Sequence, residues 1–331
     1  MNKMNDQRGQ EQKTTHLLQP PSWIRKWWVA MRPFALPASI MPVIFGTVLA
    51  VTIGKAPFNL PLFVASLFGM AILHTGANLL NDVYDYKKGI DKNVNPVSGG
   101  VVRGWITTRE ALVASWSFLA LGSVIGLIIF TQVGFSILWI GLLGIAIGVL
   151  YTWGPMPLKF NAIGDLAVFL NFGILGALGA WTVQTGQPSW VPALWAVPMS
   201  LLVVGILHAN NWRDIKNDSQ GGIHTLASIF GDIKSESYFA VLLFGPFAVI
   251  LFLIFLSFAT DLDPKMPLTF LVTFLAMPMA IKLMKTSRQR HNPGYLKNFL
   301  ALDGATAQFN LVFGILCISA LGLYALINLF K

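Results

Sequence analysis

Long apolar runs alternate with short polar stretches along most of this 331-residue chain. Nine of the runs reach the roughly 20 largely apolar residues that a helix needs to cross a bilayer. Their approximate bounds are 33–53, 60–82, 110–130, 134–152, 162–183, 189–211, 236–257, 266–285 and 305–329. The pattern predicts an all-α integral membrane protein with nine transmembrane helices, the first kinked or broken by Pro33, Pro37 and Pro42.

The composition agrees with a membrane protein. Hydrophobic residues make up 55% of the chain and charged residues only 11%, whereas soluble domains carry about 25% charged residues. Cys317 is the single cysteine and lies in an apolar run, which indicates a packing role. Residues 1–22 are polar and lack the apolar core of a signal peptide, so we expect a mobile cytoplasmic tail before one transmembrane domain at 23–331.

The distribution of basic residues predicts the orientation in the membrane. With the N-terminus inside, 20 of the 23 Lys and Arg residues lie on the cytoplasmic side, and only Lys55, Lys265 and Lys331 lie on the other. Cytoplasmic loops carry such an excess. The pattern predicts a multi-pass protein of the inner membrane with its C-terminus outside, and it explains the net charge of +9 without nucleic-acid binding.

Two acidic segments stand out in this apolar chain. They run from Asn78 to Asp91 and from Asn210 to Asp218, and they hold five of the 14 acidic residues. Carboxylates are costly near hydrocarbon and usually serve a function there. One segment ends the second predicted helix and the other ends the sixth, so both face the cytoplasm. The loops that follow, 86–109 and 212–235, are the longest and most polar internal connections, and loops this long are often functional.

Helical spacing places an amide and two carboxylates on one face in each segment. Such oxygen donors suit Mg²⁺, which is usually held by one or two carboxylates and the phosphates of a substrate. The alternative is that these residues are solvated loop charges. Asp91 follows Gly89 and has either a loop role or a metal contact. The two sets are Asn78, Asp82 and Asp85, and Asn211, Asp214 and Asp218.

Other polar residues on the same side are candidates for substrate contacts. Arg103, Lys159 and Arg213 have the charge to bind diphosphate oxygens, although each also fits a positive-inside loop charge. Asn81 and Asp165 complete this group, and Asp165 equally suits the N-terminal end of a helix dipole.

Histidine and aromatic residues lie deeper in the apolar runs. His74 and His208 precede the two acidic segments and either pack in the bundle or line a pocket for a second substrate. Aromatic rings can stabilise a carbocation, and Tyr84, Tyr151 and Phe169 lie near the right level. The tryptophans at 23, 27 and 28 are typical of a membrane interface.

The motifs exclude several enzyme classes. The chain has no His-Glu-x-x-His pair, nucleophile elbow or P-loop, which leaves metalloproteases, serine hydrolases and nucleotide hydrolases without support. A secondary transporter is the other alternative. Transporters place ionisable residues near the middle of the bilayer, whereas the acidic segments here lie at helix ends.

These residues resemble the UbiA-type intramembrane aromatic prenyltransferases, and most of all the branch that prenylates 1,4-dihydroxy-2-naphthoate in menaquinone biosynthesis. The broad family pattern has a third Asp where this chain has Gly89, and that branch shares the departure. The matching stretches are Arg32–Ser39, Asn81–Asp91, Tyr151 with Gly154–Pro155 and Pro157–Leu158, Gly164–Asp165 with Phe169, and Asn210–Asp218 continuing to Thr225–Ala227.

The resemblance implies nine transmembrane helices around a central cavity, with a cytoplasmic cap formed by the loops after the second and sixth helices. It also implies Mg²⁺-dependent transfer of a polyprenyl group from its diphosphate to an aromatic acceptor in the bilayer. In the naphthoate branch the acceptor loses CO₂ and gives demethylmenaquinol. Another aromatic acceptor, such as 4-hydroxybenzoate, is the alternative. The implied metal ligands are Asp82, Asp85, Asp214 and Asp218, with Arg103 and Lys159 assisting catalysis, and the implied substrate contacts are Asn78, Asn81, Asn211, Arg213, Tyr151 and Asp165.

Overall fold

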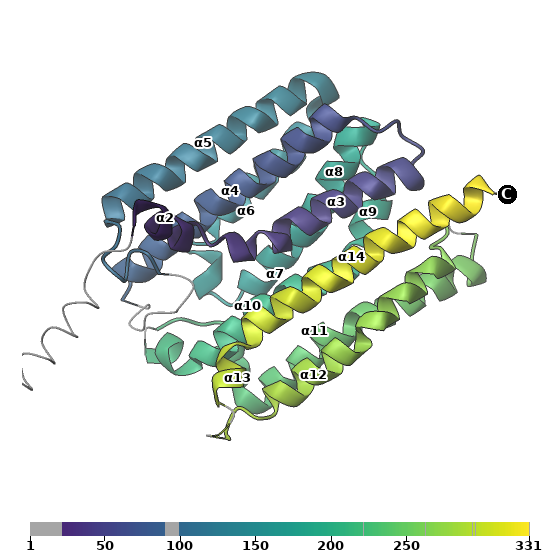
Figure 1. The fold of residues 1–331 in the computed structure, drawn as a ribbon. Coiled ribbons are helices and arrows are strands. Elements are labelled where there is room, and N and C mark those ends of the chain that lie inside the picture. The colour runs from purple at the N-terminus through teal and green to yellow at the C-terminus, as the bar shows by residue number, and fades with distance from the viewer. Residues whose placement is uncertain are drawn as a thin grey trace, which may run out of the picture.

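The computed structural model describes residues 22–89, 99–220, 222–261, 263–292, 294 and 296–330 as a bundle of helices (Figure 1). Within these ranges the only strand-like pairing is one isolated bridge between Asn161 and His224. The helices are α2 (Trp23–Met31), η1 (Pro33–Ala35), α3 (Pro37–Thr52), α4 (Leu60–Lys87), α5 (Thr108–Val133), α6 (Phe135–Leu150), η2 (Leu158–Phe160), α7 (Gly164–Val168), η3 (Phe169–Leu175), α8 (Gly176–Thr185), α9 (Trp190–Trp195), α10 (Val197–Gln220), α11 (Leu226–Ala259), η4 (Leu268–Ala276), α12 (Met277–Ser287), α13 (Leu296–Leu300) and α14 (Leu302–Leu329).

Every apolar run singled out in the sequence coincides with one helix or with two or three consecutive helices. Six helices in the described part of the chain are long and apolar enough to cross a membrane, and the pair α2/η1 and α3, bent by 49°, brings the number to seven. The protein is therefore a multi-pass membrane protein. The number of nine spans stays a prediction, because α6 has only 16 residues and the second half of α10 is polar.

Local capping determines where several helices begin. The Asn59 side chain accepts a hydrogen bond from the backbone of Leu62 at the start of α4. Reciprocal bonds between Thr107 and Glu110 begin α5, and a similar pair at Thr225 begins α11. Each cap satisfies backbone N–H groups that have no partner inside the helix.

The predicted loop at 212–235 is largely helical, which corrects the sequence-based boundaries. The α10 helix continues through the second acidic segment to Gln220, and α11 begins at Leu226. Gly231, with φ of 65°, kinks α11 five residues later. Apolar runs locate only the part of a helix that lies in the membrane, so polar extensions beyond the bilayer are missed. Asp91 and residues 1–21 lie outside the described residues.

Helices α3 and α14 run side by side through the middle of the bundle, with α4 and α5 on one flank and α11 and α12 on the other (Figure 1). Small residues allow the closest contacts. A Cβ on Gly46 of α3 would come within 2.2 Å of the Ala177 carbonyl oxygen on α8, and a Cβ on Gly173 would overlap the Ser200 side chain. The α7 helix contacts both α10 and η2, and Lys159 of η2 reaches Asp85 near the end of α4.

Candidate active site

The first acidic segment ends α4 with two buried carboxylates. Asp82 is 1% exposed, and one of its oxygens accepts a hydrogen bond of 2.7 Å from the Arg32 guanidinium. Its other oxygen accepts from the backbone N–H of Val101 at 3.3 Å. Arg32 lies at the break between α2 and η1 in a left-handed conformation, with φ of 51°. The break in the first helix therefore aims a cation at Asp82.

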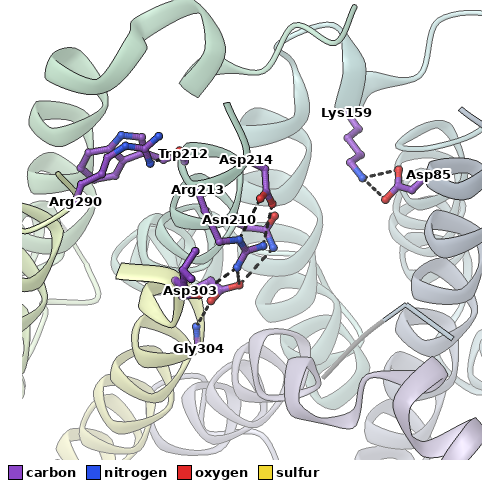
Figure 2. Close-up of polar contacts among 10 residues, drawn as sticks. Asp85, Lys159, Asn210, Trp212, Arg213, Asp214, Arg290, Asp303 and Gly304 are labelled. Carbon is purple, nitrogen blue, oxygen red and sulfur yellow. Dashed lines mark hydrogen bonds and ion pairs between the residues drawn. The ribbon is translucent and has the colours of Figure 1, made fainter. Parts of the chain in front are cut away.

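Asp85 is paired with the only basic residue of its neighbouring loop. The Lys159 ammonium lies 2.7 and 2.6 Å from the two carboxylate oxygens of Asp85 (Figure 2). It also donates to Asn81 at 3.0 Å. The same Asn81 oxygen accepts from the hydroxyl of Thr152 at 2.8 Å. These contacts place Asn81, Asp85 and Lys159 in one polar cluster, in which Asp85 is buried and the other two residues are partly buried.

Arg213 connects the second acidic segment to α14. Its guanidinium bonds Asp214 at 2.9 Å and also reaches Asp303 of α14 at 2.8 Å (Figure 2). Asn210 donates to the same oxygen of Asp303 at 3.4 Å. The Asp214 side chain is 35% exposed, whereas Asn211 and Asp218 of the same helix are buried.

Backbone pairing ties the two segments together. The N–H of Ala162 bonds the carbonyl of His224 at 2.6 Å, and the N–H of His224 bonds the carbonyl of Phe160 at 3.2 Å. Ile223 in turn donates to the carbonyl of Asp218 at 2.9 Å. The loop that carries Lys159 to Asp85 is thus fastened to the residues that follow Asp218, so the ends of α4 and α10 belong to one polar region.

Two more predicted residues lie around this region. The Arg103 guanidinium covers the ring of Trp105 at 4.6 Å, and partial burial together with the charge of Arg25 lowers the pKa of Arg103. The Tyr151 hydroxyl packs against Gly164.

The two histidines that precede the acidic segments have different environments. His74 is hydrogen-bonded to the hydroxyl of Ser39 at 2.8 Å and packs on Phe172, which assigns it to packing. His208 has no hydrogen-bond partner of good geometry for either ring nitrogen among the described residues. Its Nδ1 lies 3.9 Å from a carboxylate oxygen of Asp165, and Asp165 is hydrogen-bonded to Tyr238.

The Asn78 amide nitrogen is buried without a hydrogen-bond partner in the described chain, but as a hydrogen-bond donor it suits a phosphate oxygen and not a cation. The carboxylates fit a hard divalent cation in their chemistry. Asp82 and Asp85 offer buried carboxylate oxygens, and Asp214 and Asp218 end the other segment. Oxygen donors of this kind suit Mg²⁺. The described residues nevertheless form no group of three or more acidic, His or Cys side chains at metal-binding spacing. In this structure Arg32 and Lys159 supply the opposing charge, and the metal site stays a prediction.

Sequence reasoning missed Arg32, Thr152, Tyr238 and Asp303 as site residues. The position of Arg32 could have indicated a role in the site, since this residue opens a proline-interrupted helix. The indication for Asp303 is weaker, because it is only a lone carboxylate just before the last apolar run. Their partners are 50 to 90 positions away in the chain, so no local pattern indicates them.

Comparison with known proteins defines the class. The profile of the UbiA prenyltransferase family matches residues 39–302. The 1,4-dihydroxy-2-naphthoate octaprenyltransferase of Bacillus subtilis is 32% identical over 291 residues, covering 87% of this chain and 89% of that protein. A UbiA prenyltransferase domain-containing protein 1 homolog of Drosophila melanogaster is 30% identical over 304 residues, covering 90% and 79%.

Solved structures have the same fold. The UbiA homolog of Archaeoglobus fulgidus bound to DMAPP and Mg²⁺ superimposes with a TM-score of 0.59 at 16% identity, covering 89% of this chain and 99% of that one. The homolog of Aeropyrum pernix gives a TM-score of 0.61 at 18% identity, covering 89% and 97%. The helical bundle thus has the fold of these UbiA homologs. The chain belongs to the UbiA prenyltransferase family, and it is a prenyltransferase.

Proposed function

We propose that this enzyme transfers a polyprenyl group from polyprenyl diphosphate to 1,4-dihydroxy-2-naphthoate, with Mg²⁺ and with loss of CO₂, giving demethylmenaquinol. The observation that carries the proposal is the pairing of two buried carboxylates, Asp82 and Asp85, with two cations at the polar end of an apolar bundle. Such a site has both signs of charge needed for a metal diphosphate, next to helices that suit a prenyl chain. The naphthoate acceptor is supported by the Bacillus relative.

The residues divide into two roles by charge. Arg32, Lys159 and Arg213 would bind diphosphate oxygens, for which guanidinium and ammonium groups are suited. The carboxylates of Asp82, Asp85, Asp214 and Asp218 would hold Mg²⁺, which when bound neutralises charge on the leaving diphosphate. The Archaeoglobus homolog bound to DMAPP and Mg²⁺ supports this assignment.

The proposed reaction is balanced without a further reactant. The bond between prenyl carbon and diphosphate oxygen breaks, and its electron pair leaves with the diphosphate. The ring carbon that bears the carboxylate forms the new bond to the prenyl carbon. The carboxylate then leaves as CO₂, and the electron pair of the broken bond restores the aromatic ring. The apolar helices exclude water from the allylic cation.

The proposed arrangement in the membrane follows the distribution of charge. All the candidate residues lie in segments that positive-inside counting assigns to the cytoplasmic face. We propose nine spans, a cytoplasmic N-terminus and an external C-terminus in the inner membrane. The prenyl chain would then lie among the helices, with its diphosphate at the cytoplasmic end.

An acceptor assay tests the naphthoate assignment. The purified enzyme in lipid is incubated with polyprenyl diphosphate and Mg²⁺ and with either 1,4-dihydroxy-2-naphthoate or 4-hydroxybenzoate, and products are measured by mass spectrometry. We expect a decarboxylated prenyl naphthalenediol from the first acceptor. A product from 4-hydroxybenzoate alone would overturn the naphthoate proposal while leaving the prenyltransferase class intact.

Thermal shift tests the metal assignment without turnover. Mg²⁺ with inorganic pyrophosphate is expected to raise the melting temperature of the wild type, and Asp82→Asn and Asp214→Asn should lose that shift. Glu236→Gln is the control, because its carboxylate pairs with the exposed Arg288 outside the proposed site. An equal rise in melting temperature in the wild type and all three variants would contradict the assignment of Asp82 and Asp214 as metal ligands.

A further inference from the structure

Asp165 and His208 are buried polar residues. Their side chains lie close together but form no hydrogen bond with each other. The exposed fractions are 5% for Asp165 and 0% for His208. Asp165 Oδ2 and both ring nitrogens of His208 have no hydrogen-bond partner among the described residues. The distance from His208 Nδ1 to Asp165 Oδ2 is 3.9 Å, too long for a hydrogen bond. Because buried polar groups are nearly always satisfied, two facing groups left open indicate a missing partner.

The surroundings hold the two side chains in place. Asp165 lies in the first turn of α7 and is fastened by its hydrogen bond to Tyr238 of α11. The His208 ring stands edge-on to the Tyr238 ring, with centroids 4.7 Å apart. The backbone of Ser235 also approaches His208. Three helices therefore fix the two open groups, so that the gap between them is a built feature.

The distance between the two groups is short enough for one oxygen atom to bridge them. An atom about 2.8 Å from each group, the usual hydrogen-bond length, can bridge a span of 3.9 Å. A hydroxyl oxygen suits both sides, because it accepts from His208 Nδ1–H in that tautomer and donates its own proton to Asp165. A carboxylate would be repelled by Asp165, and an ether oxygen has no proton to donate.

The position relates this gap to the proposed reaction site. His208 is six residues before Asp214 on α10, which is about 9 Å along a helix axis toward the apolar half. On the other side, a Cβ on Gly164, the residue before Asp165, would lie 3.4 Å from the Cα of Lys159, whose ammonium pairs with Asp85. The gap thus lies next to the polar cluster on its membrane side, where the ring beside a prenyl diphosphate would lie.

We propose that Asp165 and His208 bind a ring hydroxyl of the aromatic acceptor, and so form the recognition site for a hydroxylated arene. The inference rests on the proposed function, since it requires a hydroxyaromatic substrate. It separates the two histidines, which look equivalent in the sequence: His208 binds the acceptor, whereas His74 is already satisfied by Ser39.

Steady-state kinetics of Asp165→Asn and His208→Gln test the proposal, with whichever hydroxyaromatic acceptor the wild type uses. We expect the KM for the acceptor to rise about 10- to 100-fold, the effect of losing a hydrogen bond to a charged or buried partner. The KM for the prenyl diphosphate should change less than about twofold. The matched control His74→Gln removes a buried histidine of the other half and should leave the acceptor KM unchanged.

A second measurement does not depend on the variants folding. Mono-O-methyl ethers of the acceptor, one for each ring hydroxyl, are tested as competitive inhibitors of the wild type. At least one ether is expected to bind about 10- to 100-fold more weakly than the acceptor. An acceptor KM unchanged in both folded variants, or ethers that bind as tightly as the acceptor, would overturn the proposal and leave the gap to a bound water. Failure of the naphthoate assignment would appear instead as no wild-type product from that acceptor.

Discussion

The Arg32 guanidinium lies 2.7 Å from the buried carboxylate of Asp82, across 50 positions of the sequence. The contact joins the break in the first helix to the end of α4. It places opposite charges together where a lone carboxylate would be strongly disfavoured. Substitution of either residue should therefore affect both stability and diphosphate chemistry, and the two effects can be separated.

Arg32→Ala is expected to lower the free energy of unfolding by about 3 kcal/mol, because it leaves Asp82 buried without a counter-charge. Asp82→Asn in the same background should restore much of that loss. Unfolding in mixed detergent micelles, arranged as a double-mutant cycle, measures the coupling. Independent, additive effects of the two substitutions would contradict the ion pair.

Lys159→Met is expected to lower kcat/KM for the prenyl diphosphate about 100-fold, because the lysine pairs with Asp85 and is proposed to bind a phosphate oxygen. Lys159→Arg should retain part of the activity. Lys234→Met serves as the control, since Lys234 is an exposed lysine in α11. Equal activity of the Lys159 and Lys234 variants would show that this ion pair has no part in the reaction.

Asp303→Asn should weaken one of the two ion pairs that position the Arg213 guanidinium, which lies between Asp214 and Asp303. We expect about 1 kcal/mol of lost stability for this partly exposed contact and a fall of about tenfold in kcat/KM. The exposed pair of Glu236 and Arg288 supplies the comparison, and Glu236→Gln should change stability by less than about 0.5 kcal/mol. Asp303→Asn behaving like Glu236→Gln would count against a positioning role.

Gly46→Ala is expected to destabilise the bundle by about 2 kcal/mol, because its Cβ would lie 2.2 Å from the Ala177 carbonyl oxygen on α8. Gly141→Ala on α6 is the matched substitution, with nothing within 4 Å of the new methyl group. It should be neutral or slightly stabilising, since alanine favours helix. Melting temperatures of the two purified variants give the comparison, and equal values would contradict the close contact of α3 and α8.

The positions of the helices were largely predictable from the chain alone. Every apolar run became helix, because an apolar segment in a membrane satisfies its backbone hydrogen bonds internally. The helix ends were less predictable. The polar turns of α10 that carry Asp214 and Asp218 have no apolar signal, so the boundary at 211 was placed nine residues short of Gln220.

The amino-acid sequence by itself determined that this is an α-helical membrane protein with two acidic segments at helix ends, because hydropathy and helical spacing are local properties of the chain. Only the tertiary structure decided which groups meet: Arg32 with Asp82, Lys159 with Asp85, Asp303 with Arg213, and Asp165 with Tyr238 beside His208. These contacts join different helices, so they depend on close packing at residues such as Gly46 and on the break at Pro33. The two histidines show the difference most simply, since the same sequence context holds one satisfied residue and one with both ring nitrogens open.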